Sequence, residues 1–284
     1  MTRRELLALA GASSLFSAAP SAIRVGAQTN AWKVDILDFS SLNSVLDQIR
    51  RLGFEGFETS YRNLEPVFGR VKEARAQLAE HGLRFAGCHI ALTNYDAKSN
   101  VAPHELIERV AEKAAALGAE RLILSGSPVS EDGPFDEERL RWKAGALNRA
   151  GRASEGLKLR VCYYNHSAEF VNGEMLALAK ETDSDSVRFV IDAGYALQAK
   201  ADVAAFFARN HKRIEGIHLR DFDVDAQQVA LGKGQISYEP LAAAIRKARW
   251  AGWLIADEER ANGAPAGDEA IGVAREQIRK VFGV

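Results

Sequence analysis

Two hydrophobic patterns alternate along this chain from about residue 23 onward. Short runs rich in Val, Ile, Phe and Leu favour buried parallel strands, and each is followed by a segment with apolar residues three and four apart, which favours an amphipathic helix. The strand-like runs lie at residues 23–28, 54–60, 83–91, 120–125, 157–166, 187–193, 213–221 and 252–257. The helical patterns lie at residues 42–52, 64–81, 103–117, 137–156, 174–182, 203–211, 238–248 and 269–282.

This regular alternation predicts an α/β fold with a single closed (β/α)8 TIM barrel. Eight such units, each about 30 residues long and without long insertions, are typical of that architecture. An open doubly wound sheet is the competitor, but it usually carries a glycine-rich phosphate loop after its first strand. Here the first strand runs into the string QTNAWKVD, which has no glycine. Helix ends are expected at Gly53, Gly82, Gly118 and Gly156, where a left-handed residue is favoured.

Residues 1–22 differ from the rest of the chain. Arg3 and Arg4 precede an apolar run at residues 6–19, and small residues follow up to Ala22. This order is typical of a secretory signal, and the run is too short to span a bilayer core of about 30 Å. The string TRRELL resembles a twin-arginine export signal. We expect residues 1–22 to direct export to the periplasm, residues 23–284 to form the barrel, and the mature chain to have no membrane span; an N-terminal amphipathic helix is the alternative.

The charge balance and the cysteine positions make a nucleic-acid partner and a disulfide unexpected. The chain has 37 Lys and Arg against 38 Asp and Glu, a formal net charge of −1. We therefore expect no nucleic-acid partner, since binding to that polyanion requires a basic surface. Cys88 and Cys162 lie in the third and fifth predicted strands, roughly 9–10 Å apart, and a disulfide requires Cα atoms within about 7 Å. Both are expected to be free, buried thiols.

Polar side chains stand at six of the eight expected strand tips. Function in such a barrel lies at the C-terminal strand ends and in the loops that follow them. Because unpaired buried charges are costly, we expect these groups to converge on one another, on a metal or on a substrate. They are Glu58 in the second strand, His89 in the third, Tyr164 and His166 in the fifth, Asp192 in the sixth, His218, Arg220 and Asp221 in the seventh, and Asp257 and Glu259 in the eighth.

Each of these residues also has a purely structural interpretation. Glu58 can pair with a barrel arginine such as Arg62, and His89 can be a core histidine with satisfied hydrogen bonds. His166 can cap the helix that follows it. Among Asp257, Glu258 and Glu259, one member of the acidic run is expected to face solvent. The aromatic residues of the strand ends and loops can simply pack, namely Trp32, Tyr61, Tyr164 and Tyr195.

Six strings occur in order over nearly all of the chain after residue 22: GFEGFE, YNHSAEF, VIDAGY, IHLRD, LGKGQISYEPL and WAGWLIADEE. In order and spacing they resemble the xylose-isomerase-like barrel superfamily, the AP endonuclease 2 group of sugar phosphate isomerases, epimerases and inosose dehydratases. The resemblance implies a divalent metal, Mn, Mg, Co or Zn, held by Asp192, His218 and Asp257 with Glu259 or His166. Mixed nitrogen and oxygen ligands suit such ions.

Two departures leave retention of the metal open. The family has Glu or His at the fifth-strand position that is Tyr164 here, and a neutral phenol is a poor ligand for these ions. Tyr195 stands where His is common in the family. The site therefore either binds a metal with fewer protein ligands than its relatives or has lost the metal.

The resemblance also implies chemistry at carbohydrate carbonyls. An isomerase or epimerase removes a proton next to C=O and returns it through an enediolate that a metal or another cation stabilises. Glu58, His89 and His166 are the candidate acid–base groups, expected to face the metal side across a pocket, and Arg220 can neutralise the oxyanion. Export and the lack of a phosphate loop favour a neutral sugar. The candidate substrate-binding residues are Trp32, Tyr61, Tyr164 and Tyr195.

Three other functions compete with this interpretation. A dehydratase or lyase acting on a keto-sugar, keto-glycoside or inosose shares the first step. A periplasmic sugar-binding barrel that has lost its metal and its catalysis is the second. A nuclease of the same superfamily requires a His-rich multi-zinc site, which is not favoured here because His81, His104 and His211 fall on predicted helices. The oligomeric state stays open.

Overall fold

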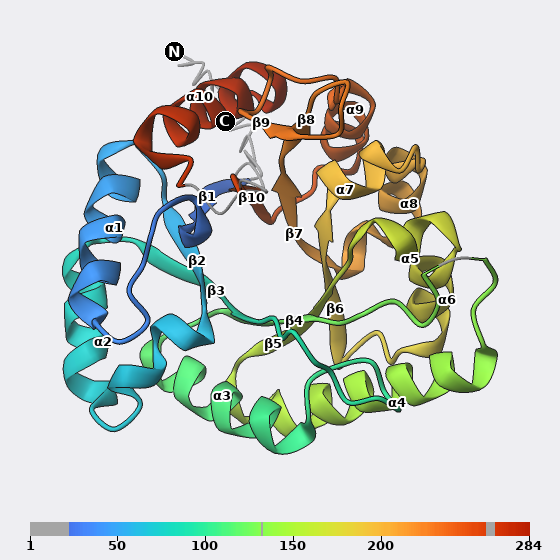
Figure 1. The fold of residues 1–284 in the computed structure, drawn as a ribbon, viewed down its shortest axis with the longest axis horizontal. Coiled ribbons are helices and arrows are strands. Elements are labelled where there is room, and N and C mark those ends of the chain that lie inside the picture. Colours follow the sequence, from blue (N-terminus) through green and yellow to red (C-terminus); the bar gives the residue numbers. More distant parts are fainter. Residues whose placement is uncertain (1–22, 132, 260–264) are drawn as a thin grey trace, which may run out of the picture.

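The computed structural model describes residues 23–131, 133–259 and 265–284. Eight parallel strands close a barrel in the order β1-β10-β7-β6-β5-β4-β3-β2, and helices surround it (Figure 1). The predicted single TIM barrel is confirmed. The predicted export signal at residues 1–22 lies outside the described residues. No helix in the described ranges combines the length and apolarity that crossing a bilayer requires.

Each strand and each covering helix lies where the hydrophobic pattern predicts it, with most ends shifted by a few residues. The largest difference is at α2, predicted from residue 64 but beginning at Val71, because a 3-10 turn at Glu65–Val67 precedes it. The barrel strands are β1 (Arg24–Gln28), β2 (Gly56–Ser60), β3 (Arg84–Ile90), β4 (Arg121–Ser125), β5 (Arg160–Tyr164), β6 (Val187–Asp192), β7 (Ile214–Leu219) and β10 (Trp253–Ala256). The covering helices are α1 (Phe39–Arg51), α2 (Val71–Glu80), α3 (His104–Leu117), α4 (Glu137–Ser154), α6 (Glu174–Glu181), α8 (Val203–Asn210), α9 (Glu239–Ala248) and α10 (Gly267–Phe282).

The sequence pattern missed the short elements that follow the strand tips. Two helices, α5 (Ser167–Val171) and α7 (Ala193–Gln198), follow β5 and β6, and a hairpin of β8 (Asp221–Phe222) and β9 (Gln228–Val229) follows β7. All are too short to show a helical or alternating period. Short 3-10 turns lie at Thr29–Ala31, Tyr61–Asn63, Glu65–Val67, Glu155–Leu157 and His211–Arg213.

One of the expected glycine helix ends is wrong. Gly53, Gly82 and Gly118 have positive φ angles, as predicted, but Gly156 does not. After α4 the chain continues into the 3-10 turn Glu155–Leu157, and Lys158 takes the left-handed conformation with φ 56°. Because of this extra turn, the left-handed residue stands at position 158, two residues after Gly156.

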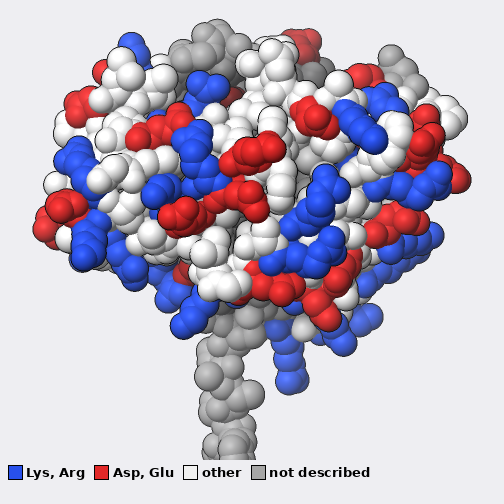
Figure 2. All heavy atoms as spheres, turned by 90° about the horizontal axis from the view of Figure 1, so that it is seen from below, with Lys and Arg blue, Asp and Glu red and all other residues white. Residues whose placement is uncertain are grey.

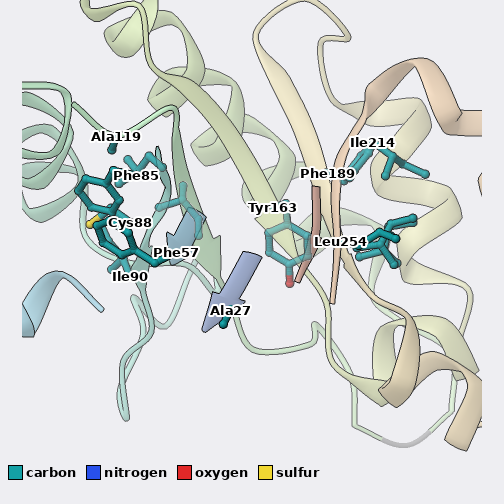
Figure 3. Packing of buried hydrophobic residues seen from close by; sticks show 14 of the residues in the cluster. Ala27, Phe57, Phe85, Cys88, Ile90, Ala119, Tyr163, Phe189, Ile214 and Leu254 are labelled. Carbon is teal, nitrogen blue, oxygen red and sulfur yellow. The ribbon is translucent and has the colours of Figure 1, made fainter. Parts of the chain in front are cut away.

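Alternation along the strands separates an outer core from the barrel interior. On β5, Val161 and Tyr163 belong to the core under the helices, whereas Cys162 and Tyr164 belong to a separate interior group. Figure 3 shows outward-facing residues of this core, among them Phe57 and Phe85, whose rings stack at 4.8 Å. The outer faces are therefore apolar, and the inward positions are left to carry polar chemistry.

The two cysteines lie on opposite sides of this wall. Cys88 packs in the outer core and Cys162 in the barrel interior, and both are buried and free, as predicted. Burial raises the pKa of the Cys162 thiol to about 12, so it stays protonated at neutral pH.

Over the molecular face drawn in Figure 2, Lys and Arg are interspersed with Asp and Glu. No large single-sign field arises where charges of both signs mix, so this face lacks the basic stripe that binding to a nucleic acid requires.

Candidate functional site

A cavity of about 320 Å³ opens at the C-terminal ends of the barrel strands. That volume falls within the range of small-molecule sites, roughly 300–1,000 Å³. Its lining includes seven residues singled out from the sequence: His89, Tyr164, His166, Tyr195, Arg220, Asp257 and Glu259. Amide side chains of Gln28, Asn30 and Asn63, which the sequence did not single out, also line it.

Beneath and beside this cavity lies a connected set of buried side chains, here called the mouth cluster. It consists of Glu58, His89, Asp192, His218, Arg220 and Asp257, contributed by five different strands or their tips. All six are buried. Parallel strands in a barrel bring their C-terminal ends to one rim, so residues distant in sequence meet there.

Glu58 anchors one end of the mouth cluster. Its Oε2 accepts hydrogen bonds from His89 Nε2 at 2.5 Å and from His218 Nε2 at 2.8 Å. Its Oε1 accepts one from Arg121 Nη2 at 2.8 Å. Burial alone would raise the pKa of Glu58, but His218 and Arg121 hold it well below its usual range. Glu58 is therefore a fixed carboxylate that orients both histidines.

Glu58 pairs with a barrel arginine, as its structural interpretation expected, but the partner is Arg121 and not Arg62. Arg121 points into the barrel from the start of β4, whereas Arg62 lies in the 3-10 turn after β2. Glu58 also does not face the cluster across a pocket; it is hydrogen-bonded to His218 within it. Both side chains point into the narrow barrel interior, so residues from different strands come within hydrogen-bonding distance there.

His218 connects the two halves of the mouth cluster. Its Nε2 contacts Glu58, and its Nδ1 lies 2.7 Å from Oδ2 of Asp257. Because both ring nitrogens face carboxylates, both are donors and the ring is an imidazolium. Burial lowers the pKa of His218, but Glu58 and Asp257 outweigh this and raise it to about 9. Asp257 is ionised as well. Burial raises its pKa, but the neighbouring Arg220 and His218 outweigh burial and lower it.

Arg220 lies between the two aspartates. Its Nη2 donates to Asp257 Oδ2 at 2.5 Å, and its Nε forms an ion pair with Asp192 Oδ2 at 2.8 Å. Its guanidinium stacks over the Tyr195 ring at 4.4 Å. Burial lowers the pKa of Arg220, but the two aspartates outweigh it and hold the pKa well above its ordinary value. Arg220 is thus a permanently charged group fixed at the cavity wall.

Asp192 closes the other end of the cluster. Its Oδ1 accepts the Tyr195 backbone N–H at 2.8 Å and so caps α7, while its Oδ2 accepts the Tyr164 hydroxyl at 2.5 Å. Burial raises the pKa of Tyr164 well above 10, with Asp192 adding to the effect. The Tyr164 phenol therefore stays protonated and donates.

Asp221, at the tip of the seventh strand, holds a loop instead of joining the cluster. Its carboxylate accepts backbone N–H groups of Phe222, Gly232, Gly234 and Ile236, at 2.9–3.0 Å. The close approach requires glycine at 234, since a Cβ there would lie 2.3 Å from the Phe222 carbonyl oxygen. Gly232 and Gly234 thus allow this loop to approach Asp221 closely at the barrel rim.

The hairpin next to that loop completes the surroundings of Arg220. Gln228 of β9 accepts from Arg220 Nη1 at 3.2 Å through its side-chain oxygen and donates to the Asp257 carbonyl at 2.7 Å. On the opposite side, Asn30 donates to Asp257 Oδ1 at 2.9 Å. These two amides and Arg121 were missed from the sequence; for Arg121 a signal existed, namely a charged residue at an inward position of an apolar strand.

His166 caps a helix, as its structural interpretation expected, and its ring also lines the cavity. Its backbone N–H donates to Glu169 Oε2 at 2.9 Å in the capping box that starts α5. Its ring lies 5.7 Å from that of Tyr164 and 6.0 Å from that of Tyr195, on the cavity wall. Capping therefore fixes the backbone and leaves the imidazole turned to the cavity.

The acidic run after β10 divides as side-chain alternation predicts. Asp257 and Glu259 face the cavity, and Glu259 lies at the rim with its Oε2 3.7 Å from Arg220 Nη1. Burial, followed by repulsion from Asp257, raises the pKa of Glu259. Glu258 turns away, and its Oε1 accepts the Leu231 backbone N–H at 3.0 Å.

Two predicted substrate contacts lie elsewhere. Tyr61 is buried in the outer core, and Trp32 donates through Nε1 to Asp268 Oδ1 at 2.8 Å. Neither is among the described residues that line the cavity. Their positions do not support stacking on a sugar ring.

Among the described residues, two groups of three side chains could hold a metal ion by distance alone. They are Glu58, His89 and His218, and Asp192, His218 and Asp257, with ligand atoms within 4.8 Å of one another in each group. Whether those atoms are free to bind an ion depends on the hydrogen bonds described above.

Known proteins share the fold and part of the sequence of this chain. The family model for the xylose isomerase-like TIM barrel matches residues 46–280. An inosose dehydratase of Clostridium tetani is 22% identical over 268 residues, covering 84% of this chain and 90% of its own length. The structure of a sugar phosphate isomerase/epimerase from Parabacteroides distasonis has a TM-score of 0.71 at 20% identity, covering 91% of this chain and 94% of its own. That of an L-ribulose 3-epimerase has a TM-score of 0.75 at 17% identity, with 92% and 95% covered.

Proposed function

Since the chain belongs to the xylose isomerase-like TIM barrel family, we propose that it catalyses proton transfer at a carbon next to the carbonyl of a neutral keto-sugar or keto-polyol. One observation carries this proposal. His89, held through Nε2 by Glu58 at 2.5 Å, and the guanidinium of Arg220 line the same cavity. An oriented imidazole and a fixed cation are the two groups that enolisation requires.

The first step uses these two residues. With Nε2 of His89 donating to Glu58, the lone pair lies on Nδ1, which takes the proton from the substrate carbon. The C–H electron pair forms the C=C bond of the enediolate, and the carbonyl oxygen becomes an oxyanion. Nη1 of Arg220, which lies 3.3 Å from the Tyr195 hydroxyl, 3.2 Å from Gln228 and 3.7 Å from Glu259 Oε2, is the guanidinium nitrogen that donates to that oxyanion. Glu58 stabilises the imidazolium formed at His89.

A second acid–base group decides the outcome of the reaction. The rings of His89 and His166 both neighbour the Tyr164 ring, at 5.8 Å and 5.7 Å between ring centres. In an epimerase, His166 delivers a proton to the opposite face of the carbon. In a dehydratase, it protonates the β-hydroxyl, the C–O bond breaks and water leaves. The named epimerase neighbours support the first outcome, which we favour, and the inosose dehydratase relative supports the second.

The cavity lining supports a neutral substrate. Arg220 is the one Lys or Arg among the described residues that line it, and two aspartates already neutralise its charge. Amides and hydroxyls of Gln28, Asn30 and Ser60 offer hydrogen bonds suited to sugar hydroxyls. A phosphate group, with nearly two negative charges, would have no free cation to pair with.

Solvent-deuterium exchange tests the proposal. The protein is incubated in D2O with a panel of keto-hexoses, 3-oxidised glycosides and inososes, and the carbon-bound hydrogen is followed by NMR. We expect exchange into at least one substrate, and product analysis then separates an epimer from a dehydrated product. Binding of a sugar without any exchange would reject catalysis and leave the sugar-binding interpretation in its place.

We also propose that residues 1–22 direct twin-arginine export, on the strength of Arg3 and Arg4 before the apolar run at residues 6–19. Replacing both arginines by lysine is expected to keep the protein in the cytoplasm. Fractionation of cells that express the two forms measures this, and an unchanged periplasmic yield would rule out the route.

A further inference from the structure

We propose that the mouth cluster works without a metal ion, because Arg220 fills the place between Asp192 and Asp257 where the family resemblance puts a divalent cation. Its catalytic meaning rests on the proposed function, but the exclusion of the ion is a property of the donor atoms themselves. Three observations carry it: carboxylate oxygens that already have partners, a histidine with a carboxylate at each ring nitrogen, and buried guanidiniums beside the carboxylates.

All four carboxylate oxygens of the two aspartates already have partners. Asp192 uses Oδ1 for the Tyr195 N–H and Oδ2 for the Tyr164 hydroxyl and Arg220 Nε. Asp257 uses Oδ1 for Asn30, and Oδ2 for His218 Nδ1 and Arg220 Nη2. An ion bound here would have to displace several buried charge-assisted hydrogen bonds, which are the strong ones.

His218 cannot serve as a ligand in this arrangement. A metal-bound histidine offers one neutral ring nitrogen to the ion and donates through the other. In His218 both ring nitrogens lie against carboxylate oxygens, at 2.7 Å and 2.8 Å, so an ion could reach either nitrogen only by displacing Asp257 or Glu58. The same ring belongs to both of the three-residue groups that distance alone would allow, so neither offers a complete donor set.

Charge balance points the same way. The buried carboxylates of Glu58, Asp192 and Asp257 already lie against two buried guanidiniums, those of Arg121 and Arg220. A divalent ion added to these three negative and two positive charges would leave a net buried positive charge, which is costly. Relatives of this chain are expected to have a carboxylate or histidine at the fifth strand; Tyr164 here supplies neither charge nor a good ligand atom.

The test measures metal binding directly, so it does not depend on finding the substrate. Untagged protein, purified without added metal, is analysed for bound metal by mass spectrometry and titrated calorimetrically with Mn²⁺ and with Zn²⁺. We expect no saturable binding of either ion. If a substrate has been found, prolonged treatment with a chelator is expected to leave the deuterium-exchange rate unchanged.

A gain-of-binding variant sharpens the test. Arg220→Gln combined with Tyr164→Glu removes the competing cation and restores a carboxylate at the fifth strand. We expect this double variant to bind one Mn²⁺ per chain, whereas Arg109→Gln, at an exposed position on α3, binds none. Circular dichroism confirms that each variant is folded; if the double variant is not, Arg220→Lys with Tyr164→Glu replaces it, because lysine keeps one charge but cannot bridge both aspartates.

Two results would overturn the proposal. One is a wild-type protein that holds one ion per chain and loses it in Asp192→Asn. The other is a folded double variant that still binds no ion, which would show that Arg220 and Tyr164 are not the reason for exclusion. Neither result depends on whether exchange is detected, so failure of the proposed function and failure of this inference remain distinct.

Discussion

Two buried ionic clusters lie on opposite sides of strand β5, and they differ in what their charged groups hold. The mouth cluster lies inside the barrel. The second, here called the outer cluster, consists of Lys143, Tyr163, Glu169 and Glu174 and lies between β5 and helices α4, α5 and α6. Lys143 Nζ donates to Glu174 Oε1 at 2.5 Å and lies 3.9 Å from Glu169 Oε1.

The partners of the two clusters differ in kind. In the outer cluster the carboxylates mainly hold chain segments: Glu174 accepts the Val129 N–H at 2.7 Å, and Glu169 accepts the His166 N–H at 2.9 Å. In the mouth cluster, charged side chains of different strands mainly hold one another, and several of them border the cavity. Burial of charge therefore does not by itself mark a catalytic site. Glu169 of the outer cluster also lines a cavity, of about 260 Å³, so the two clusters differ in what their charged groups hold.

Tyr163 and Tyr164 show how sharply the two clusters are separated. They are consecutive on β5, yet the Tyr163 hydroxyl donates to Glu169 at 2.7 Å and the Tyr164 hydroxyl donates to Asp192 at 2.5 Å. Because successive strand residues point to opposite faces, one tyrosine reaches the helices and the other reaches the barrel interior. The variants below test whether this division is also a division of roles.

The largest effect is expected for His89→Gln in the mouth cluster. Glutamine can keep a hydrogen bond to Glu58 but cannot take a proton, so the deuterium-exchange rate should fall by about 10²–10⁴-fold with the fold retained. His104→Gln, at the start of α3, is the control and should exchange at the wild-type rate. A His89 variant with undiminished exchange would assign the base to another residue.

Lys143→Met should have the largest effect on stability. Removing the one cation leaves Glu169 and Glu174 buried together, and breaking a buried pair in this way costs about 3–5 kcal/mol. The free energy of unfolding, from denaturant titration, measures this, while exchange per folded molecule should persist. Lys72→Met, exposed on α2, should change stability by less than about 0.5 kcal/mol. If Lys143→Met loses no more unfolding free energy than Lys72→Met, the outer cluster contributes no stability.

Alkaline pH should weaken the mouth cluster specifically. The pKa of His218 is raised from 6.5 to about 9, so its contribution to stability is full below about pH 6.5 and is lost as pH rises toward 9. At about 1.4 kcal/mol per tenfold change in proton affinity, the loss is on the order of 3 kcal/mol. The measurement is unfolding free energy between pH 6.5 and 9.

The control for this pH profile is His218→Gln, which should have a flatter slope whatever its absolute stability. The surface variant Lys72→Met, which leaves both clusters intact, should keep the wild-type slope. If His218→Gln keeps that slope too, the pH dependence has another origin.

The smallest effects are expected for the paired variants Tyr163→Phe and Tyr164→Phe. Tyr163→Phe removes a donor to Glu169 and should cost about 1–3 kcal/mol of stability without slowing exchange. Tyr164→Phe removes a donor to Asp192, which keeps Arg220, and should slow exchange about tenfold, or about 1.4 kcal/mol in activation free energy. Matching losses of exchange in both variants would contradict the division of roles along β5.

Much of the site could be predicted because strand tips can be read from a sequence. Asp192, His218 and Asp257 end apolar runs, and in a parallel barrel the ends of such runs share one rim. Arg220 was expected to face the site, but its place between Asp192 and Asp257 was not. Side-chain alternation gives a direction, whereas the reach and partner of a long side chain depend on the neighbours it meets.

The sequence by itself determined the closed barrel, its covering helices and the face of each strand on which the polar residues lie, because hydrophobic period and burial are local consequences of residue order. Only the tertiary structure decided that Glu58 joins His218 in the cluster, that Arg121 rather than Arg62 pairs with it, and that Arg220 takes the place expected for a metal. These are pairings between residues up to 160 positions apart. Closing the barrel sets the distances between these side chains. A hydrogen bond requires donor and acceptor atoms to lie about 3 Å apart, so each side chain's partner depends on those distances rather than on sequence spacing.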